Sequence, residues 1–513
     1  MYFLGLDIGS SSVKLAIING ETGDCIAKTQ QPQTELAIQA PQPGYAEQSP
    51  EDWWQAVVAG IRQLLAKAPQ AAKQINAIGI SYQMHGLVAL DKQHKVLHPA
   101  IIWCDSRATQ TGERAFTSLG EDWCMQHLLN SPGNFTIAKL KWLADNRPEI
   151  YSSVDKILLP GDYIALRLSG ELSTTPSGLS EAIAWDFRDR QPSRQLLNKL
   201  GIDGSLLPPV VPNFGEGGVL SRAAAAELGL TAGIKLSYRA GDQPNNAFSL
   251  NVLEAGEFAA TAGTSGVVYA VTDQLIADRN QRINGFLHVS PQAKHPLVGL
   301  LACINGAGRL NSWLRQLVSA GGEVSFQKLN ALAAQIPAGS LGLSVHPFGN
   351  GAERILGNRL LQAQLQGIDF NRHQLAHIAR AVQEGVAFAM AAGVSLIGSL
   401  GASSRVIRAG MANMFLSDVF TEAFVNTTRT AVELYDTNGA EGAARGAGWA
   451  AGFYGSRDEA FKQLKKIRTL EPQPALTGIY EEIYDRWQEQ LTRLTGQAHS
   501  PKGMKRLGLE EPA

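Results

Sequence analysis

The amino-acid sequence predicts an α/β protein with two lobes, and three observations support this fold class. Residues 4–14 and 260–269 share one plan: an apolar strand, a tight Gly/Ser/Thr turn and a second apolar strand. Predicted strands and helices alternate along both halves of the chain, which is the pattern of α/β domains. The chain has 513 residues, more than one hydrophobic core usually holds, so we expect two or more domains.

The first half opens with consecutive strands and a well-marked helix. Ser49 is the expected N-cap, Pro50 fits the first helical position, and Asp52 stands where a capping-box acid would. Apolar residues at helical spacing continue this helix as far as Leu65. The strands expected in this half are residues 2–8, 13–19, 24–30, 77–81, 87–90 and 100–103.

The chain is helical and loop-rich over residues 110–187, and the second half then repeats the order of the first. Its main expected elements are strands at 237–240 and 405–408, a long amphipathic-to-apolar helix at 369–400, a closing helix at 480–494 and a charged tail from Gly496. We place the domain boundary near residue 247, which divides the chain into domains 1–247 and 248–513.

Composition excludes several classes of protein. The formal net charge is −1, so the basic footprint of a nucleic-acid-binding protein is missing. The N-terminus has no basic region before an apolar stretch, so no signal peptide is expected. The most apolar segment, residues 386–400, is divided by glycines and predicts a buried helix rather than a membrane span. The cysteines lack disulfide or zinc spacing, and we therefore expect a reducing cytoplasm. They are Cys25, Cys104, Cys124 and Cys303.

The two Gly/Ser/Thr turns indicate an anion site. Such turns point backbone N–H groups and hydroxyls into a small concavity, which suits phosphate. Asp7, at the end of a strand, is placed to hold a water-coordinated Mg²⁺, and Asp242 precedes the second turn. A polar hairpin turn explains the first stretch equally well if it is taken alone; the second turn favours phosphate binding.

Two further glycine-containing stretches have different interpretations. Residues 409–413 follow a buried strand and are expected to open a helix, a usual setting for a nucleotide. Residues 437–448 carry small side chains at helical spacing, so close helix packing is at least as good an explanation as ligand contact. The chain has no G-x-x-x-x-G-K-[ST] motif, which disfavours a P-loop kinase.

Several stretches, taken in order, resemble the FGGY carbohydrate kinases of the actin-like ATPase superfamily, and most of all the members that act on xylulose. The resemblance runs from about residue 2 to residue 495, and it rests on the number and order of the stretches. These stretches are residues 5–14, 83–86, 96–107, 134–143, 161–163, 168–171, 241–242, 263–267, 351–354 and 380–388.

The resemblance implies two actin-like (ribonuclease H-like) domains flanking a catalytic cleft, with sugar bound by the first and nucleotide by the second. It implies an ATP-dependent sugar kinase in which Asp242 is the general base and Asp7 and Asp242 serve Mg²⁺. The substrate contacts expected by position are Gln83, Met84, His85, Asp105, Arg107, Asp242 and Gln243. The expected ATP contacts are Gly9, Ser10, Ser11, Ser12, Lys14, Gly263, Thr264, Ser265, Gly410, Met411 and Asn413. Alternatives for two of these sites stay open: His85 as a satisfied core residue, and Asp105 with Arg107 as an internal ion pair.

The chain departs from the family pattern near the sugar and the nucleotide. Gln243 follows the expected base where Asn is usual, Met411 ends a motif that is usually Gly-Gly-Gly-Ala, Cys104 replaces a common Asn, and Tyr82 replaces a common Gly. The expected substrate is D-xylulose, with L-ribulose, L-fuculose, a heptulose or glycerol as alternatives. No nucleic acid or membrane partner is expected, and a homodimer is possible.

A non-catalytic actin-like protein is the competing class. A sugar sensor of the repressor type would need a DNA-binding segment before the first turn, and Asp7 comes too early to leave room for one. A filament protein would have no use for residues 83–85 and 103–105 in this arrangement. We therefore expect an enzyme.

Overall fold

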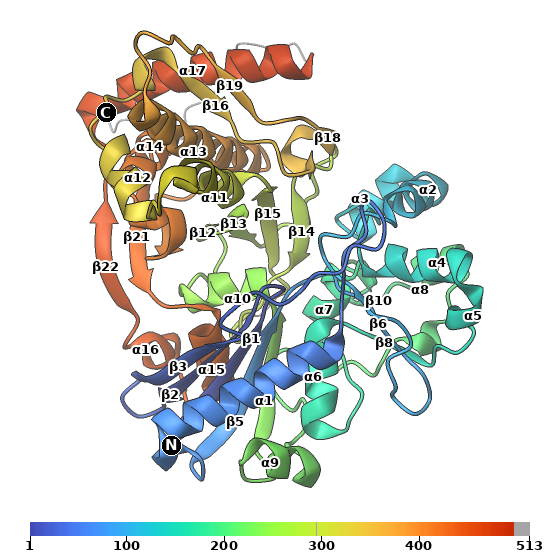
Figure 1. The fold of residues 1–513 in the computed structure, drawn as a ribbon. Coiled ribbons are helices and arrows are strands. Elements are labelled where there is room, and N and C mark those ends of the chain that lie inside the picture. The colour runs from blue at the N-terminus through green and yellow to red at the C-terminus, as the bar shows by residue number, and fades with distance from the viewer. Residues whose placement is uncertain (294, 497–513) are drawn as a thin grey trace, which may run out of the picture.

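The computed structural model describes residues 1–293 and 295–496 and has two α/β domains, each built on a central sheet (Figure 1). The first sheet has the order β11-β5-β1-β2-β3. Strands β1, β2 and β3 form an antiparallel meander, and β5 and β11 continue it in parallel with β1. These strands are β1 (Tyr2–Ile8), β2 (Val13–Asn19), β3 (Cys25–Gln31), β5 (Ile75–Tyr82) and β11 (Lys235–Gly241).

The second sheet repeats this plan. In the order β14-β15-β13-β12-β20-β21-β22, the strands β12, β13 and β15 are an antiparallel meander, and β20 and β21 run parallel with β12. Its strands are β12 (Phe258–Ala262), β13 (Gly266–Thr272), β14 (Asn284–Leu287), β15 (Val298–Ile304), β20 (Val406–Gly410), β21 (Ala431–Asp436) and β22 (Lys465–Leu470). The expected repetition of the first half by the second is therefore confirmed at the level of sheet topology.

Helix α1 (Pro50–Lys67) covers one face of the first sheet because it buries an apolar stripe that includes Trp53, Val57 and Ile61. Ser49 precedes this helix as expected, but its side chain makes no capping hydrogen bond. The predicted capping box is therefore wrong, and Pro50 and the acidic first turn carry the start of the helix.

A helical lobe is inserted between β5 and β11, on the right in Figure 1. Two predicted strands, 87–90 and 100–103, belong to this lobe in shortened form and do not join the main sheet. The helices between β5 and β11 are α2 (Thr109–Leu119), α3 (Glu121–His127), α4 (Thr136–Asn146), α5 (Pro148–Tyr151), α6 (Pro160–Ser169), α7 (Pro176–Glu181), α8 (Arg194–Leu200) and α9 (Arg222–Leu228). Of these, α6 and α9 pack beside α1 at the first sheet rather than in the lobe. Within the lobe, β6 (Val88–Leu90) pairs with β8 (Lys156–Leu158) and β9 (Trp185–Asp186) with β10 (Gln191–Pro192). The strand β7 (Ala100–Ile101) pairs with β4 (Glu47–Gln48), which precedes α1.

The long helix α13 (Leu375–Ser399) and its neighbours pack against the second sheet. The long helix α13 begins at Leu375, not at residue 369, and ends at Ser399. It is long and apolar enough to cross a membrane, yet 78% of its most apolar window is buried inside the protein, so it is a core helix. The other helices are α10 (Asp242–Ser249), α11 (Ala307–Val318), α12 (Phe326–Ala333), α14 (Asp418–Thr428), α15 (Gly439–Ala450), α16 (Arg457–Phe461) and α17 (Pro474–Thr495). The remaining short pairs are β16 (Ser344–His346) with β19 (Gln364–Gln366) and β17 (Ala352–Glu353) with β18 (Arg359–Leu360).

Helix α15 leaves the second half of the chain and packs on the first sheet, beside β1 and β5. A Cβ atom added to Gly5 would lie 1.8 Å from the carbonyl oxygen of Ala440, and one added to Gly79 would lie 2.0 Å from that of Ala443. Only glycine allows this approach of backbone to backbone. The small residues of 437–448 therefore serve close packing, which couples the two halves of the chain.

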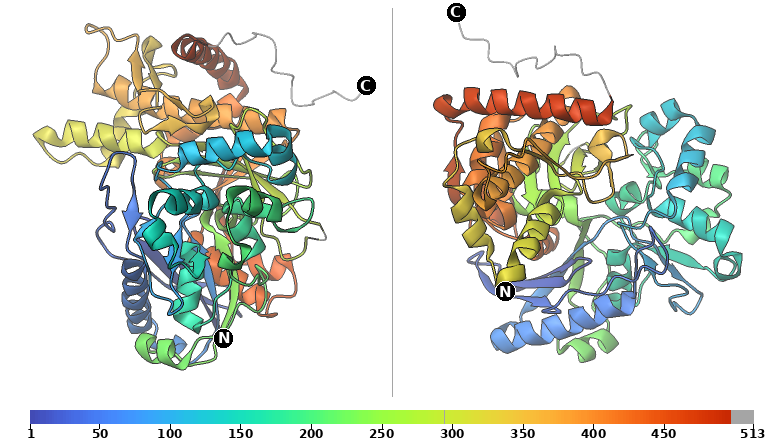
Figure 2. Two further views of the ribbon diagram at one scale, coloured as in Figure 1. Left: turned by 90° about the vertical axis from the view of Figure 1, so that its right-hand side faces the viewer. Right: turned by 45° about the horizontal axis from the view of Figure 1, so that its top comes forward.

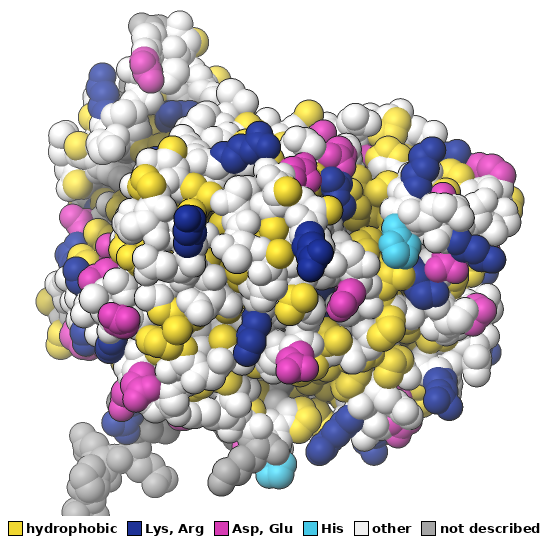
Figure 3. Space-filling model, turned by 90° about the horizontal axis from the view of Figure 1, so that it is seen from below, with side chains coloured by type: hydrophobic (Ala, Val, Ile, Leu, Met, Phe, Trp, Pro, Cys, Tyr) yellow, Lys and Arg dark blue, Asp and Glu magenta, His cyan; other side chains and the backbone are white. Residues whose placement is uncertain are grey.

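The ends of the described chain lie far apart. Helices α1 and α17 occupy opposite ends of the molecule in Figures 1 and 2, and the predicted charged tail beyond Gly496 lies outside the described residues. On the face seen from below, Lys and Arg side chains are interspersed with Asp and Glu (Figure 3), as expected for a chain of net charge −1.

Candidate active site

Two aspartates lie at one edge of the first sheet. Asp7 stands at the end of β1, and Asp242 is the first residue of α10, directly after β11. Both strands run parallel with β5, so their carboxyl ends meet at the same edge, where α/β proteins usually bind ligands. Burial raises the pKa of Asp242 to about 7, and the nearby carboxylate of Asp7 adds to this rise.

Asp7 is held in place by two neighbours. The Ser81 hydroxyl donates a hydrogen bond to its Oδ1 at 2.7 Å. The N-terminus of α15 reaches its other oxygen: a Cβ atom added to Gly439 would lie 2.5 Å from Oδ2. A carboxylate at a helix N-terminus is stabilised by the positive end of the helix dipole. The second half of the chain thus completes the setting of Asp7.

The site has the donor chemistry that Mg²⁺ requires. Carboxylate oxygens are its preferred protein ligands, and it commonly keeps several waters and takes phosphate oxygens as well. Asp7 and Asp242 are near enough for one charge to influence the other. In the part of the chain that the structure describes, no three or more His, Cys, Asp or Glu side chains gather into a metal site, so the residues present fit an ion shared with phosphates.

The first Gly/Ser/Thr turn is a hairpin between β1 and β2. The Gly9 N–H donates to the Ser12 carbonyl at 3.0 Å, and the Ser10 carbonyl accepts from the Gln48 amide at 2.6 Å. Ser11 and Lys14 are exposed, whereas Ser12 is buried. Lys14 lies opposite Asp7 in the register of strands β1 and β2. The positive charge of Lys14 opposes the rise in the pKa of Asp242. Lys14 therefore lies beside the two carboxylates, and Ser11 is exposed in the turn.

The second turn is bound to helix α11 and to the stretch after β20. The carbonyls of Gly263 and Thr264 accept from the first turn of α11, at 3.1 and 3.0 Å. A Cβ atom added to Gly263 would lie 3.4 Å from the side-chain amide of Asn413. The turn and residues 410–413 are thus neighbours, as a shared nucleotide site would require.

The stretch after β20 differs in one respect from its prediction. It opens only a short 3₁₀ helix, Asn413–Leu416, in which Asn413 begins with a left-handed φ of 54°. The Met411 N–H donates to the Tyr435 carbonyl at 2.8 Å. Residues 409–413 were expected to open a helix; they open this short 3₁₀ helix, and the next α-helix, α14, begins only at Asp418.

Cys303 connects the second turn with the first domain. This residue of β15 pairs with Val267, and its thiol hydrogen bonds with Ser265. Burial raises the pKa of this thiol to about 12, and the carboxylates of Glu353 and Asp242 add to the rise. The turn at 263–266 and Asp242 therefore face the same region between the domains.

The stretch Gln83–Met84–His85 follows β5, beside Asp7 and Asp242. Gln83 donates to the Gln48 side chain at 3.1 Å, while its own Oε1 is buried without a hydrogen-bond partner among the described residues. Such an oxygen is costly unless a ligand satisfies it. Gln83 is therefore equipped to accept a hydrogen bond from a ligand hydroxyl.

His85 is partly exposed, and its surroundings favour the uncharged ring. Burial lowers its pKa to about 3, and the charge of Lys139 lowers it further. Its Nδ1 donates to the Glu181 carbonyl at 2.9 Å, and its ring packs against Phe135 and Phe286. The interpretation of His85 as a satisfied core residue therefore holds for its Nδ1 atom.

Asp105 and Arg107 form the internal ion pair that the sequence left open. The Arg107 guanidinium lies 2.7 Å from the Asp105 carboxylate and 2.7 Å from that of Glu47. It also stacks on Tyr45, with 3.7 Å to the ring centroid. Asp105, which is fully buried, accepts a further bond from the Ala46 N–H at 2.6 Å. This network joins the loop at residues 102–108 to residues 45–47.

Three more residues belong to the site and were not predicted as site residues. Lys139 donates to the carbonyls of His85 and Ile102, at 2.8 and 2.9 Å, and burial lowers its pKa to about 7. Arg354 comes from the second domain, and its guanidinium lies 5.4 Å from the ring centroid of Phe135. The Glu181 carbonyl accepts the hydrogen bond from the His85 ring. Lys139 and Arg354 stand in stretches that carry the family resemblance, so that signal was available; Glu181 had none.

The second domain also contributes backbone contacts to the helical lobe of the first domain. The Leu287 N–H, at the end of β14, donates to the Ser180 hydroxyl at 2.9 Å, and the Gly285 carbonyl accepts from the Asn130 amide at 2.6 Å. With Phe286 against His85, strand β14 seals the helical lobe of the first domain.

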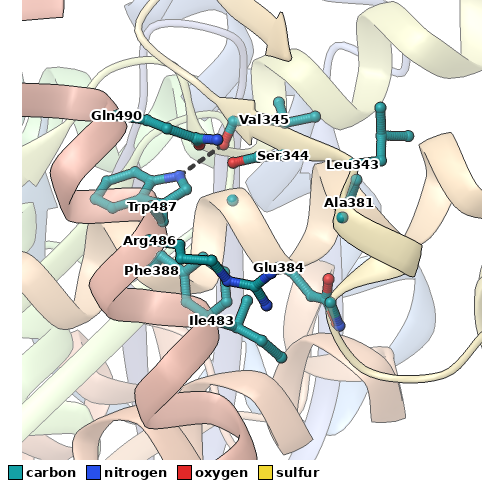
Figure 4. Close-up of a pocket in the computed structure, with 13 residues that line it drawn as sticks. Leu343, Ser344, Val345, Ala381, Glu384, Phe388, Ile483, Arg486, Trp487 and Gln490 are labelled. Atoms are coloured by element: carbon teal, nitrogen blue, oxygen red, sulfur yellow. Dashed lines mark hydrogen bonds between the residues drawn. The ribbon is translucent and has the colours of Figure 1, made fainter. Parts of the chain in front are cut away.

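A separate cavity of about 90 Å³ lies in the second domain, between β16, α13 and α17 (Figure 4). The buried carboxylate in its wall, Glu384, is already bound by Arg380 at 2.7 Å and by the Gly339 N–H at 3.0 Å. None of the predicted site residues lines this cavity. It is not part of the site around Asp242.

Comparison with known proteins identifies curated relatives over most of the chain. It is 28% identical to the xylulose kinase of Bacillus subtilis (strain 168), over 94% of this chain and 96% of the relative. It is 30% identical to the xylulose kinase of Escherichia coli (strain K12), over 78% of this chain and 79% of the relative.

Solved structures show the same fold. The crystal structure of a xyloylose kinase from Brucella ovis matches with a TM-score of 0.86 and 27% identity, over 97% of this chain and 100% of that chain. The gluconate kinase of Lactobacillus acidophilus matches with a TM-score of 0.85 at 22% identity, over 96% and 98% of the two chains. The expected fold of two actin-like α/β domains is confirmed by these matches.

Two family models divide the chain between them. Residues 2–249 match the N-terminal domain and residues 258–453 match the C-terminal domain of the FGGY family of carbohydrate kinases. Together with the curated relatives, these matches show that the chain belongs to the FGGY family of carbohydrate kinases.

Proposed function

We propose that this carbohydrate kinase transfers the γ-phosphoryl group of ATP to D-xylulose and produces D-xylulose 5-phosphate and ADP. The observation that carries the proposal is the pair Asp7 and Asp242 at one sheet edge, next to Gln83–Met84–His85 and opposite the turn at 263–266. The choice of D-xylulose is supported by relatives described as xylulose kinases at 28% and 30% identity.

In this proposal Asp242 accepts the proton of the 5-hydroxyl group. The hydroxyl oxygen forms a bond to the γ-phosphorus as the bond from that phosphorus to the β,γ-bridging oxygen breaks and ADP leaves. Phosphoryl transfer needs positioning and charge neutralisation more than covalent help. A carboxyl with a pKa of about 7 is well matched to a proton acceptor at neutral pH.

The remaining residues bind and orient. Ser11 and Lys14 contact phosphate from the first domain, and Gly263, Thr264 and Ser265 contact it from the second. Residues 410–413 lie on the nucleoside side. Gln83 and His85, both uncharged, suit a neutral polyol, because hydroxyl groups need fixed donors and acceptors rather than a counter-charge. Mg²⁺, held by Asp7 with Asp242, would supply positive charge to the phosphates.

The ionic network of Asp105 and Arg107 holds the loop over the sugar, and we assign it a positioning role. Gln243 hydrogen bonds with Asp242, which orients the carboxylate.

We propose the domain division at residue 247 because sugar is assigned to the first domain and nucleotide to the second. We propose the cytoplasm as the compartment, since all four cysteines are free thiols, and a homodimer as the assembly.

A coupled ADP-release assay across a panel of sugars tests this function. D-xylulose is expected to give the highest kcat/KM among D-xylulose, L-ribulose, L-fuculose, a heptulose and glycerol. Faster turnover of another sugar would replace D-xylulose as the substrate and leave the kinase assignment intact. ATP-dependent assembly in gel filtration without turnover of any sugar would favour the non-catalytic class.

A further inference from the structure

Glu181 is a buried carboxyl group with no partner. Its side chain is 1% exposed, and neither carboxyl oxygen has a hydrogen-bond partner within residues 1–293 and 295–496. A buried acceptor left unsatisfied destabilises a fold, and native proteins leave few such groups without a reason. This carboxyl therefore calls for a ligand or for a function that its burial serves.

The carboxyl lies between two segments of the proposed sugar site. A Cβ atom added to Gly241 would lie 2.6 Å from the Glu181 Oε2 and 2.7 Å from the Met84 Cγ. Gly241 directly precedes the proposed base Asp242, and the Glu181 carbonyl holds the His85 ring at 2.9 Å. Glu181 thus lies beside the strand end before the base, near the Met84 side chain, and its carbonyl bonds the His85 imidazole.

Burial also decides the charge of this group. It raises the pKa of Glu181 well above its usual range, and the carboxylates of Asp242 and Asp162 add to the rise. Burial thus favours the protonated carboxyl, which donates one hydrogen bond and accepts others. A neutral donor and acceptor of this kind fits a sugar hydroxyl and does not require a cation.

Tyr82 forms the wall behind Glu181. Its ring occupies space that glycine leaves open, since a Cβ atom on Gly161 would lie 2.1 Å from the ring. Its hydroxyl is also buried and lies next to the Glu181 carboxyl, without a hydrogen bond of ordinary geometry to it. Burial raises the pKa of this phenol well above its usual range, and the Glu181 carboxylate adds to the rise.

We infer that Glu181 is a specificity-determining residue of the sugar site, whose carboxyl group hydrogen bonds with one hydroxyl group of the bound sugar while Tyr82 closes the space behind it. This inference rests on the proposed function and adds the residue that selects among polyols. A site built to bond a hydroxyl discriminates strongly against an analogue that lacks it, because its buried polar group is then left unpaired.

The test combines variants of the enzyme with variants of the sugar. Glu181→Ala and Glu181→Gln are assayed with whichever sugar gives the wild type its highest kcat/KM, and with the series of its monodeoxy analogues. For Glu181→Ala we expect kcat/KM for the intact sugar to fall by about tenfold or more, with an unchanged KM for ATP. With one deoxy analogue the difference between variant and wild type should shrink to about twofold or less. Glu181→Gln keeps the shape and the hydrogen-bonding capacity, so it should retain more of the activity.

Tyr82→Phe is the matched control for a purely structural role. It keeps the ring and removes only the hydroxyl next to Glu181, so it should leave the ranking of the deoxy analogues unchanged. If Tyr82→Phe reproduces the losses of Glu181→Ala, the carboxyl serves the phenol and the inference is overturned. It is also overturned if Glu181→Ala weakens every analogue by the same factor, or changes only the thermal unfolding midpoint. Absence of turnover by the wild type with every sugar would instead refute the proposed function.

Discussion

Replacing Asp242 by asparagine should change activity and stability in opposite directions. The variant keeps the size of the side chain and its place at the start of α10 but loses the proton acceptor, so kcat should fall by about 10²- to 10⁴-fold. The structure predicts no loss of stability, because burial and the charge of Asp7 raise the pKa of this carboxyl from 3.8 to about 7.

The sign of the stability change follows from this shift. A carboxyl whose folded pKa is raised binds its proton more tightly in the folded state, so the wild type loses stability as the pH rises from about 4 to about 7. Asparagine has no such penalty. At about 1.4 kcal/mol per pKa unit, the variant should gain up to about 4 kcal/mol relative to the wild type above pH 7.

The assay pairs coupled ADP release with urea unfolding at pH 5 and pH 8 on one preparation. Asp145→Asn is the matched control, since Asp145 is an exposed residue of α4 in an i,i+4 ion pair with Lys141, and it should change neither measurement appreciably. A kcat within about threefold of the wild type would refute the base assignment. Lower stability at pH 8 than the wild type would refute the account of the buried carboxyl.

Three further predictions follow from the same geometry. Asp7→Asn removes a charge that raises the pKa of Asp242. In a pH series of kcat/KM, the fall on the acid side, near pH 7 in the wild type, should therefore move to lower pH. An unchanged position of this fall would show that Asp7 does not influence the titration of Asp242. Gly79→Ala places a Cβ atom 2.0 Å from a backbone oxygen of α15 and should lower the free energy of unfolding by about 1–3 kcal/mol or more, whereas Gly478→Ala, exposed in α17 with open space around it, should raise it by up to about 1 kcal/mol. Arg380→Met leaves the buried Glu384 carboxylate without its cation and should cost about 3–5 kcal/mol in urea unfolding; a neutral effect would show that the pair contributes nothing.

Elements with a strong local pattern were predicted well from the sequence. The strands at 2–8 and 13–19 and the start of the helix at Pro50 agree with the structure to the residue. Apolar periodicity and turn residues determine such elements locally. The predicted start at residue 369 was wrong because polarity there resembles a helix face, while the chain adopts a turn before Leu375.

Candidate site residues were predicted to different degrees. Asp7 and Asp242 were found because each stands at a strand end in a family-like stretch, and the structure places both at one sheet edge. Lys139 and Glu181 were not selected as site residues. Their importance lies in contacts with His85, which is 54 and 96 residues away in sequence, and no local pattern reports such contacts.

The sequence alone established the α/β class, the duplicated plan and the family, because these depend on periodicity and on motifs that are contiguous in the chain. The tertiary structure was needed to show that α15 returns to the first sheet and brings Gly439 to Asp7. It was also needed to show the Glu181 carboxyl buried near Met84 without a hydrogen-bond partner among the described residues. Burial and the distances between charges arise only when remote segments pack together, and these set the pKa of Asp242 and the hydrogen bonds still open to a sugar.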